Sequence, residues 1–190
     1  MSPKKYLSIF SAIFILILAT LACTMNVGGP DYPDAIIPVS TQAAESLKTQ
    51  LTDALKSGVQ GGTIILTITE TQITSYLALK LEAQEDPLFT EPQVYLRDGQ
   101  MQIYGRAHQG YFVANVGIMV SVGIDVEGQP TITITSADFG PFPAPEGLTS
   151  SLAAIIKEAY TGAVGPVATG FRIENIIITD GFIVMSGQVK

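Results

Sequence analysis

Few residues of this sequence are of the types that carry out catalysis or hold metal ions. The only histidine is His108, and the carboxylates Glu82, Glu85 and Asp86 cluster after a segment of helical pattern. A lone histidine near a strand end is usually an ordinary surface residue, and acidic residues after a helix usually face solvent. The sequence has no Gly-x-Ser-x-Gly nucleophile motif, no Walker motif and no Asp-x-Asp-x-Asp calcium loop. Because an active site needs converging titratable groups, we expect no catalysis, no metal and no cofactor.

The residue with the clearest chemical role is Cys23, the only cysteine in the chain. It follows an N-terminal segment in which two lysines precede an apolar stretch from Tyr6 to Ala22. A positive start, an apolar segment of this length and small residues near its end are typical of a secretory signal. Residues 19–23 (ATLAC) resemble a lipobox, where a bacterial signal peptidase cuts before a cysteine that carries lipid. We therefore expect residues 1–22 to be a signal peptide and Cys23 to be lipidated with acyl chains such as palmitate.

An uncleaved signal anchor is the alternative. The apolar stretch is at the short edge of the length that spans a bilayer, and Thr20 and Leu21 depart from the usual lipobox residues. Either way, the rest of the chain is expected outside the cytoplasm, anchored to the outer face of a bacterial-type cell membrane. With no second cysteine, its fold must depend on an apolar core rather than on disulfides.

The charge of the mature chain limits its partners. Without Lys4 and Lys5 the ten basic residues become eight, against seventeen acidic ones, for a net charge of −9. This acidity argues against nucleic-acid binding, which depends on neutralising phosphates. It also argues against electrostatic adhesion of the domain body to anionic lipid. Attachment to the membrane is therefore assigned to the N-terminus.

The first part of the mature chain has the composition of a linker. Residues 24–38 (TMNVGGPDYPDAIIP) hold three prolines and two adjacent glycines, without an apolar period. We predict that residues 23–38 are a lipidated cysteine followed by a flexible tether. Residues 39–190 are predicted to form a single domain, which is long enough for one apolar core.

Two helices and a first strand are predicted at the start of this domain. Ser40 and Thr41 can cap a helix that runs to Lys56 with apolar residues at three- and four-residue spacing. Residues 63–68 (TIILTI) read as a strand, and Thr69 and Gln72 have the spacing of a capping box. The second helix is predicted from Glu70 to Ala83.

The remainder of the chain is mostly of strand pattern. Asp-Gly pairs at 98–99 and 180–181 predict hairpins, the second of them between strands at 171–179 and 182–189. A long strand at 110–126 alternates strictly, and another follows at 131–139. A proline-rich loop at 140–145 precedes a predicted helix at 146–160. The order predicts an α+β fold in which a curved antiparallel β-sheet packs on two to three helices.

The apolar face of the long strand suggests a ligand site. A curved sheet and its helices can enclose a groove for an acyl chain or another apolar ligand. The predicted lining is Val116, Ile118, Val120, Val122 and Ile124 on the strand, facing Leu152, Ile155 and Ile156 on the helix. On this hypothesis Val120→Asp abolishes ligand binding. The alternative is a closed, dry core, in which case the protein is an interaction module that presents loops such as Gly140–Pro145 to an unknown envelope partner.

Four segments together resemble the YpmS-like extracytoplasmic proteins and, more distantly, the LmeA-like lipoproteins. They are Ile68–Ile73 at the start of a helix, Val94–Gly105 with its Asp-Gly turn, Gly140–Pro145 before a helix, and Ile176–Gly181 near the end. Thr74 and Ser75 occupy a stretch where that group usually has an asparagine. Members are similar to tubular lipid-binding modules, so the resemblance implies a sheet wrapped on a long helix and a hydrophobic ligand. It brings no catalytic residues.

Overall fold

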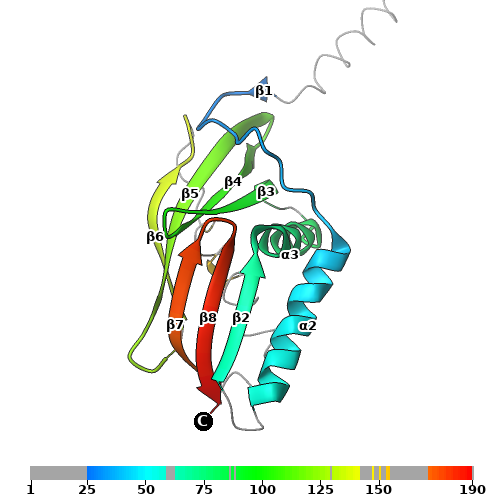
Figure 1. Cartoon of the computed structure of the whole chain (residues 1–190). Coiled ribbons are helices and arrows are strands. Elements are labelled where there is room, and N and C mark those ends of the chain that lie inside the picture. Colours follow the sequence, from blue (N-terminus) through cyan, green and yellow to red (C-terminus); the bar gives the residue numbers. More distant parts are fainter. Residues whose placement is uncertain are drawn as a thin grey trace, which may run out of the picture.

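The computed structural model describes residues 25–58, 63–85, 87, 89–128, 130–141, 147, 150, 153–154 and 171–189. In these residues two helices pack with two β-sheets, which confirms the α+β class (Figure 1). The elements, in chain order, are β1 (Met25–Asn26), α2 (Thr41–Gly58), β2 (Thr63–Thr69), α3 (Glu70–Glu82), β3 (Phe89–Arg97), β4 (Gln100–Gln109), β5 (Phe112–Ile124), β6 (Pro130–Asp138), β7 (Phe171–Thr179) and β8 (Phe182–Val189).

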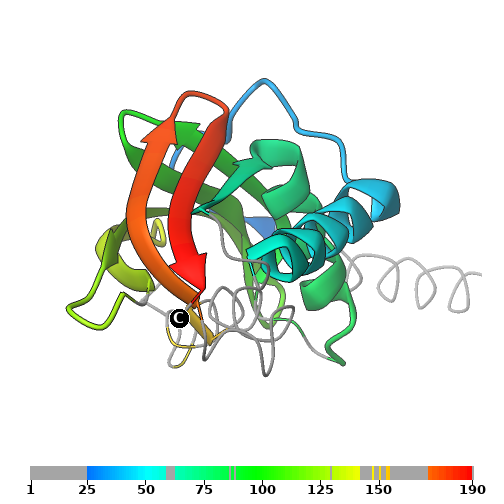
Figure 2. The ribbon, with the colours of Figure 1, turned by 60° about the horizontal axis from the view of Figure 1, so that its bottom comes forward.

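Both helices begin where their capping residues predict. The Ala43 N–H donates to the Ser40 hydroxyl (3.3 Å) in front of α2. Thr69 and Gln72 form a complete capping box, in which each side chain accepts from the other residue's backbone N–H. The two helices pack against each other, α2 also packs on β2, and α3 packs on β3 (Figure 2). The first two predicted helices and the capping box are confirmed.

The larger sheet has five strands in the order β1-β5-β4-β3, with β6 paired to β5. The β3–β4 turn is of the predicted kind, since Asp98 (φ 54°) and Gly99 (φ 73°) are both left-handed, as a type I′ hairpin requires. Along one edge of β5, β1 pairs in parallel with Phe112 and Val113, and β6 pairs antiparallel from Gly117 onward. The free edge of β5 is thereby covered along most of its length.

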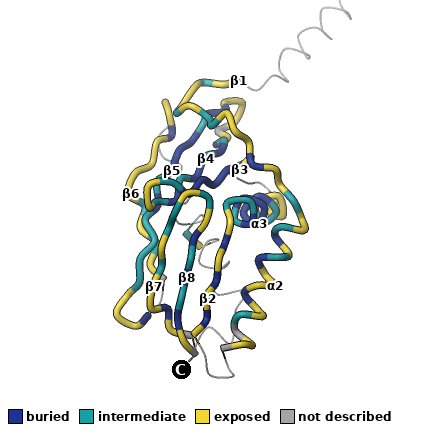
Figure 3. The backbone as a smooth tube through the Cα atoms, in the orientation of Figure 1, coloured by how far each residue is buried: buried dark blue, intermediate teal, exposed yellow. Residues whose placement is uncertain are grey.

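The smaller sheet has three antiparallel strands in the order β2-β8-β7. Along β2, exposed and buried residues alternate without a break, so one face of this sheet points into the core and the other to solvent (Figure 3). Asp180 and Gly181 form the predicted turn between β7 and β8, and both strand ranges are as predicted.

The predicted curved sheet packed on helices is present, and the strands of the chain divide between it and a second, smaller sheet. β8 takes β2 and β7 as its two neighbours, so the terminal hairpin forms a sheet with the first long strand of the chain rather than joining β6. The sheets meet at two corners. Ile173 N–H donates to the Gly128 carbonyl (2.9 Å), and Gly181 N–H donates to the Leu96 carbonyl (3.1 Å). Alternation within a strand does not specify its neighbours.

One apolar core lies between the sheets and the helices. It includes Leu47 and Leu51 of α2, Leu77 of α3, Ile103 of β4 and Met185 of β8, which come from both sheets and both helices. Tight packing is evident at Gly105, where an added Cβ would lie 2.2 Å from Cζ of the fully buried Phe89.

The long strand ends earlier than predicted, since β5 stops at Ile124 and Val126 is 94% exposed.

The segment predicted to be a flexible tether differs from that prediction over its described part. Residues Met25–Pro38, called the strap below, run across the outer face of the larger sheet and meet α2 at its N-terminus (Figure 1). Ile37 in this segment is buried. The predicted helix at 146–160 lies outside the described residues apart from isolated positions. No helix in the part of the chain that the structure describes is long and apolar enough to cross a membrane.

Candidate functional site

The predicted lining residues of β5 occupy two different environments. Val116, Ile118 and Val120 are at most 1% exposed and belong to the apolar core. Val122 and Ile124, nearer the end of the strand, are partly exposed and pack on the same core. The first three therefore lie within the core, and the last two are the members of this set with partly exposed side chains.

Partly exposed apolar side chains on the inner faces of both sheets pack against the same core. Register places Ile132 and Ile134 of β6 opposite Val122 and Val120, so all of them lie on the inner face. On β7, Ile176 and Ile178 lie opposite the buried Met185 and Ile183 and also lie on the inner face. We call this group the seam: Val122, Ile124, Ile132, Ile134, Ile176 and Ile178.

Leu152, Ile155 and Ile156 lie outside the described residues, and so does Cys23, the predicted lipidation site. The predicted meeting of the helix at 146–160 with β5 therefore stays a prediction. The described part of any ligand site on this face comes from the two sheets.

The outer face of the larger sheet carries a second set of interactions, which hold the strap. Tyr32 of the strap donates its hydroxyl to the Glu91 carbonyl, and Tyr95 of β3 donates its hydroxyl to the strap's Ala35 carbonyl. The Asn115 amide donates to the Pro30 carbonyl (3.2 Å). Side chains from β3 and β5 thus bind the backbone of a segment that has no regular structure beyond β1.

Gln93 makes the most enclosed of these contacts. Its side chain is 4% exposed, accepts from the Ile37 N–H (2.7 Å) and donates to the Ile37 carbonyl (3.3 Å). Both backbone groups of a buried apolar residue are satisfied by one amide, which is what a buried peptide group requires. Ser75 of α3 continues the fastening by accepting from the Ser40 N–H (3.0 Å).

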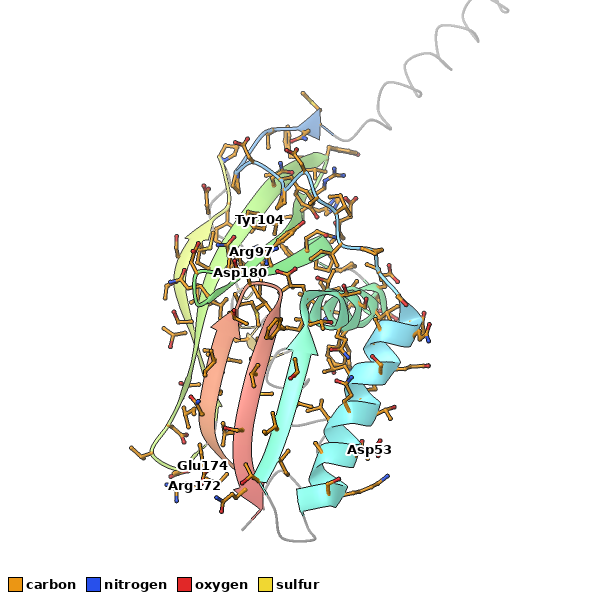
Figure 4. All side chains as sticks on the ribbon, viewed as in Figure 1. Asp53, Arg97, Tyr104, Arg172, Glu174 and Asp180 are labelled. Atoms are coloured by element: carbon orange, nitrogen blue, oxygen red, sulfur yellow. The ribbon has the colours of Figure 1, made fainter. Side chains whose placement is uncertain are left out.

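A polar hollow of about 610 Å³ opens between the strap and the outer face of β3 and β4. Its side chains are largely aromatic or charged: Asp31, Tyr32, Pro33, Asp34, Tyr95, Arg97, Gln102 and Tyr104. The Tyr95 and Tyr104 rings meet edge to face at 6.0 Å, and the Arg97 guanidinium lies 5.8 Å from the Tyr95 ring centre. In Figure 4, Arg97 and Tyr104 lie close together, with Asp180 of the β7–β8 turn below them. We call this the tyrosine hollow.

Glu70, the first residue of α3, holds the Arg97 side chain in position. The two side chains form an ion pair, and the Glu70 carboxylate also accepts the Leu96 N–H (2.6 Å). A carboxylate in the first helical turn is favoured by the helix dipole. The floor of the hollow is therefore rigid, since α3, β3 and the ion pair hold one another.

Both tyrosines that fasten the strap have raised pKa values. Burial, followed by the nearby Glu91 carboxylate, raises the pKa of Tyr32 from 10.0 to about 12, although Arg106 acts in the opposite direction. Burial, followed by Glu70, also raises the pKa of Tyr95. The two phenols therefore remain protonated hydrogen-bond donors at neutral pH, not candidate bases or nucleophiles.

A second hollow of about 470 Å³ lies on the other side of Tyr32, between the strap, the end of α3 and the start of β3. Apolar groups form much of its lining, among them Ile36, Val39 and Leu81. At its rim Arg106 pairs with Glu91 (3.1 Å), and Glu91 has a left-handed backbone (φ 50°) at an irregularity in the β3–β4 pairing. Such a conformation is unusual for a residue other than glycine.

The structure gives no sign of metal chemistry in the part it describes. Among the described residues, no group of three or more His, Cys, Asp or Glu side chains could hold a metal ion. His108 is exposed and its Nε2 lies 2.9 Å from the Thr90 hydroxyl.

No protein-family model matches the chain, and no curated protein is significantly similar to it in sequence. The resemblance to YpmS-like and LmeA-like proteins accordingly stays a prediction that depends on the four segments quoted above.

Sequence reasoning missed both hollows because it assigned the strap to a linker. Two signals were present in the sequence. Ile36 and Ile37 are adjacent apolar residues within a proline- and glycine-rich stretch, which a solvated linker does not need. Large polar or aromatic residues also alternate with apolar ones along β3, at Gln93 and Tyr95, where a bare outer face would favour small or charged residues.

Proposed function

We propose that this protein is a membrane-tethered extracytoplasmic lipoprotein that binds a lipid or another apolar ligand without catalysis. The anchor is the lipidated Cys23 predicted from the sequence. The ligand lies between the two sheets, against the seam. The observation that carries this proposal is the partial exposure of apolar side chains from both sheets on one shared inner face.

Two further observations support an apolar ligand at this place. Each seam residue is Val or Ile, so a hydrocarbon chain that lies against these side chains meets apolar groups. Among the described residues, the backbone hydrogen bonds between the two sheets are those at Gly128–Ile173 and Leu96–Gly181. A space between two sheets that are not paired along their length can widen without breaking a β-ladder.

The proposal is tested on a chain that begins at Thr24, which keeps the whole strap. Organic extracts of the purified protein, before and after incubation with phospholipid, are analysed by mass spectrometry. We expect stoichiometric lipid in the unmodified chain, loss of that lipid in Ile134→Asp, and retention in Thr133→Asp. Thr133 is the matched control, because it precedes Ile134 on β6 but is exposed on the other face.

Circular dichroism and thermal unfolding accompany each variant. If Ile134→Asp is folded and retains the lipid, the seam is not the ligand site. If the unmodified chain is folded but stays empty after exposure to lipid, ligand binding is refuted and the second candidate below gains support.

The second candidate is an interaction module for an envelope protein, and the tyrosine hollow favours it. Tyrosine and arginine are the residue types enriched at the centre of protein interfaces, and this hollow combines Tyr32, Tyr95, Tyr104 and Arg97 on a rigid floor. A photo-reactive amino acid at Gln102, inside the hollow, should then crosslink one defined partner in cells. The same group at Thr133 should not, and Tyr104→Ala should abolish the crosslink at Gln102.

A further inference from the structure

Exposed apolar side chains gather at the end of the molecule where the N-terminal segment joins it. Met25 is 60% exposed, Tyr111 67% and Phe112 45%. Met25 and Phe112 are register partners in the β1–β5 pair, and the Met25 N–H donates to the Tyr111 carbonyl (2.8 Å). We call these three residues and Gly110 of the β4–β5 turn the tip, which lies at the top of Figure 1.

The tip is unusual for a hairpin end. Gly110 (φ 62°) provides the left-handed turn, but the residues after it are aromatic, whereas turns and their neighbours favour small polar residues. Single exposed apolar residues are common on soluble proteins, but adjacent ones mark contact surfaces. None of the three belongs to the apolar core.

The segments that form this end of the molecule also contain no charged residues. Neither residues 24–30 nor residues 107–124 contain Asp, Glu, Lys or Arg, although the whole chain has seventeen acidic residues. The next charges along the neighbouring strands are Glu91 and Arg106, which form an ion pair (3.1 Å). The tip can therefore enter an apolar medium without burying an unpaired charge.

The chain itself indicates which apolar medium this is. Met25 follows Cys23 by two residues, and two extended residues span only about 7 Å. The polar headgroup layer on each side of a bilayer is about 5–8 Å thick. Since β1 is hydrogen-bonded into the sheet at both ends, with Val27 N–H donating to the Val113 carbonyl (2.9 Å), the tip cannot move far from the anchored residue.

We infer that the tip inserts into the lipid interface of the membrane that holds the anchor, so that the domain stands on this end in a fixed orientation. Tyr111 and Phe112 enter the headgroup region beside Met25, as aromatic residues do at membrane interfaces. The contact is apolar and uncharged, so the acidity of the domain body does not oppose it. This inference depends on the membrane tethering proposed above and goes beyond it, because a flexible tether would leave the orientation free.

The chain contains no tryptophan, so a single introduced indole reports its surroundings alone. Tyr111→Trp and Phe112→Trp place it at the tip. Phe182→Trp is the control, since Phe182 is 39% exposed at the start of β8, next to Gly181, whose N–H donates to the Leu96 carbonyl of β3. Leu96 pairs with Met101 at the start of β4, whereas the tip follows the end of β4. The length of β4 separates the two sites by about 25 Å. Each full-length variant is reconstituted into phosphatidylcholine–phosphatidylglycerol vesicles with or without bromine on the acyl chains, and flotation checks attachment.

We expect both tip variants to lose most of their emission in brominated vesicles and to emit at shorter wavelength, while Phe182→Trp is quenched several-fold less. Two tip positions are used so that misfolding of one leaves the other as the test. If the protein floats with the vesicles but the tip variants are quenched no more than the control, the inference is overturned and the tethering stands. If the full chain does not float, the tethering fails and this inference fails with it.

Discussion

On the inner face of the larger sheet Val116, Ile118 and Val120 are at most 1% exposed among other apolar side chains, whereas the outer face is covered by the strap through hydrogen bonds. The inner contacts are non-directional and gain free energy with the area that they remove from water. The outer contacts are few and directional, and each stabilises the fold by about 1 kcal/mol. One face thus supplies the stability of the fold, and the other supplies the position of the chain that leads to the anchor.

The largest effect is expected from Val120→Asp, at the centre of the inner face. Val120 is 1% exposed, so the variant buries an unpaired carboxylate, and we expect a loss of about 4 kcal/mol or more in the free energy of unfolding. Urea denaturation measures the free energy of unfolding. Ser121→Asp is the control, because the side chain of Ser121 points to the opposite face of β5 from Val120. Loss of the fold in Val120→Asp would support a closed core at this position, whereas a folded variant that fails to bind ligand would support the predicted lining. A folded variant of unchanged stability would contradict the expected loss.

Gly105 on the inner face and Gly117 on the outer face of the larger sheet differ in the space available for an added methyl group. A Cβ at Gly105 would lie 2.2 Å from Phe89 on the inner face, whereas a Cβ at Gly117 would lie 3.3 Å from Pro30 of the strap on the outer face. We expect Gly105→Ala to cost close to the upper end of about 1–3 kcal/mol, because a filled core cannot yield. Gly117→Ala should cost less, since the strap can move by a few tenths of an ångström. Equal losses in thermal unfolding would show that the strap is packed as tightly as the core.

Sequence patterns predicted the elements far better than their assembly. Capping residues and Asp-Gly turns act locally, so α2, α3 and both hairpins lie where the residues indicate. Pairing of β2 with β8 joins segments more than a hundred residues apart, and no local preference encodes it. The division into two sheets therefore could not be predicted from alternation.

The candidate site was predictable to a similar extent. Alternation assigned every second residue from Val116 to Ile124 to one face of the strand, and these residues do share a face. The change from full to partial burial after Val120 depends on where β6 and β7 lie. The strap was missed because its contacts depend on side chains such as Gln93 and Asn115 that come from distant strands. From its composition alone, the strap was predicted to be a linker.

Removing one fastening of the strap should have a smaller effect than either inner change. Gln93→Ala leaves the N–H and carbonyl of the buried Ile37 without their partner, and we expect a loss of about 1–2 kcal/mol. Limited proteolysis should also cut between Asp31 and Pro38 faster than in the unmodified chain. Gln102→Ala is the control. Gln102 lies on the same outer face, but its side chain accepts a long hydrogen bond (3.5 Å) from the Tyr104 hydroxyl, which does not involve the strap. If Gln93→Ala leaves both stability and cleavage unchanged, the strap is not fastened at this residue.

The smallest predicted effect is a pH dependence that comes from Tyr32. Its pKa is 10.0 in an ordinary setting and about 12 in the folded chain, because burial and Glu91 disfavour the phenolate. The unfolded chain therefore loses this proton first as the pH rises. The stabilisation is fully present below pH 10 and is lost as the pH rises toward about 12.

Tyr32→Phe isolates this contribution, since it removes the titrating hydroxyl and its bond to the Glu91 carbonyl while keeping the ring. The free energy of unfolding should fall less steeply above pH 10 in this variant than in the unmodified chain. Tyr111→Phe is the matched control for loss of a phenol, because Tyr111 is 67% exposed and lies outside the strap. Parallel slopes for all three proteins would mean that Tyr32 ionises freely in the folded state, and hence that its fastening of the strap opens at alkaline pH without cost to the core.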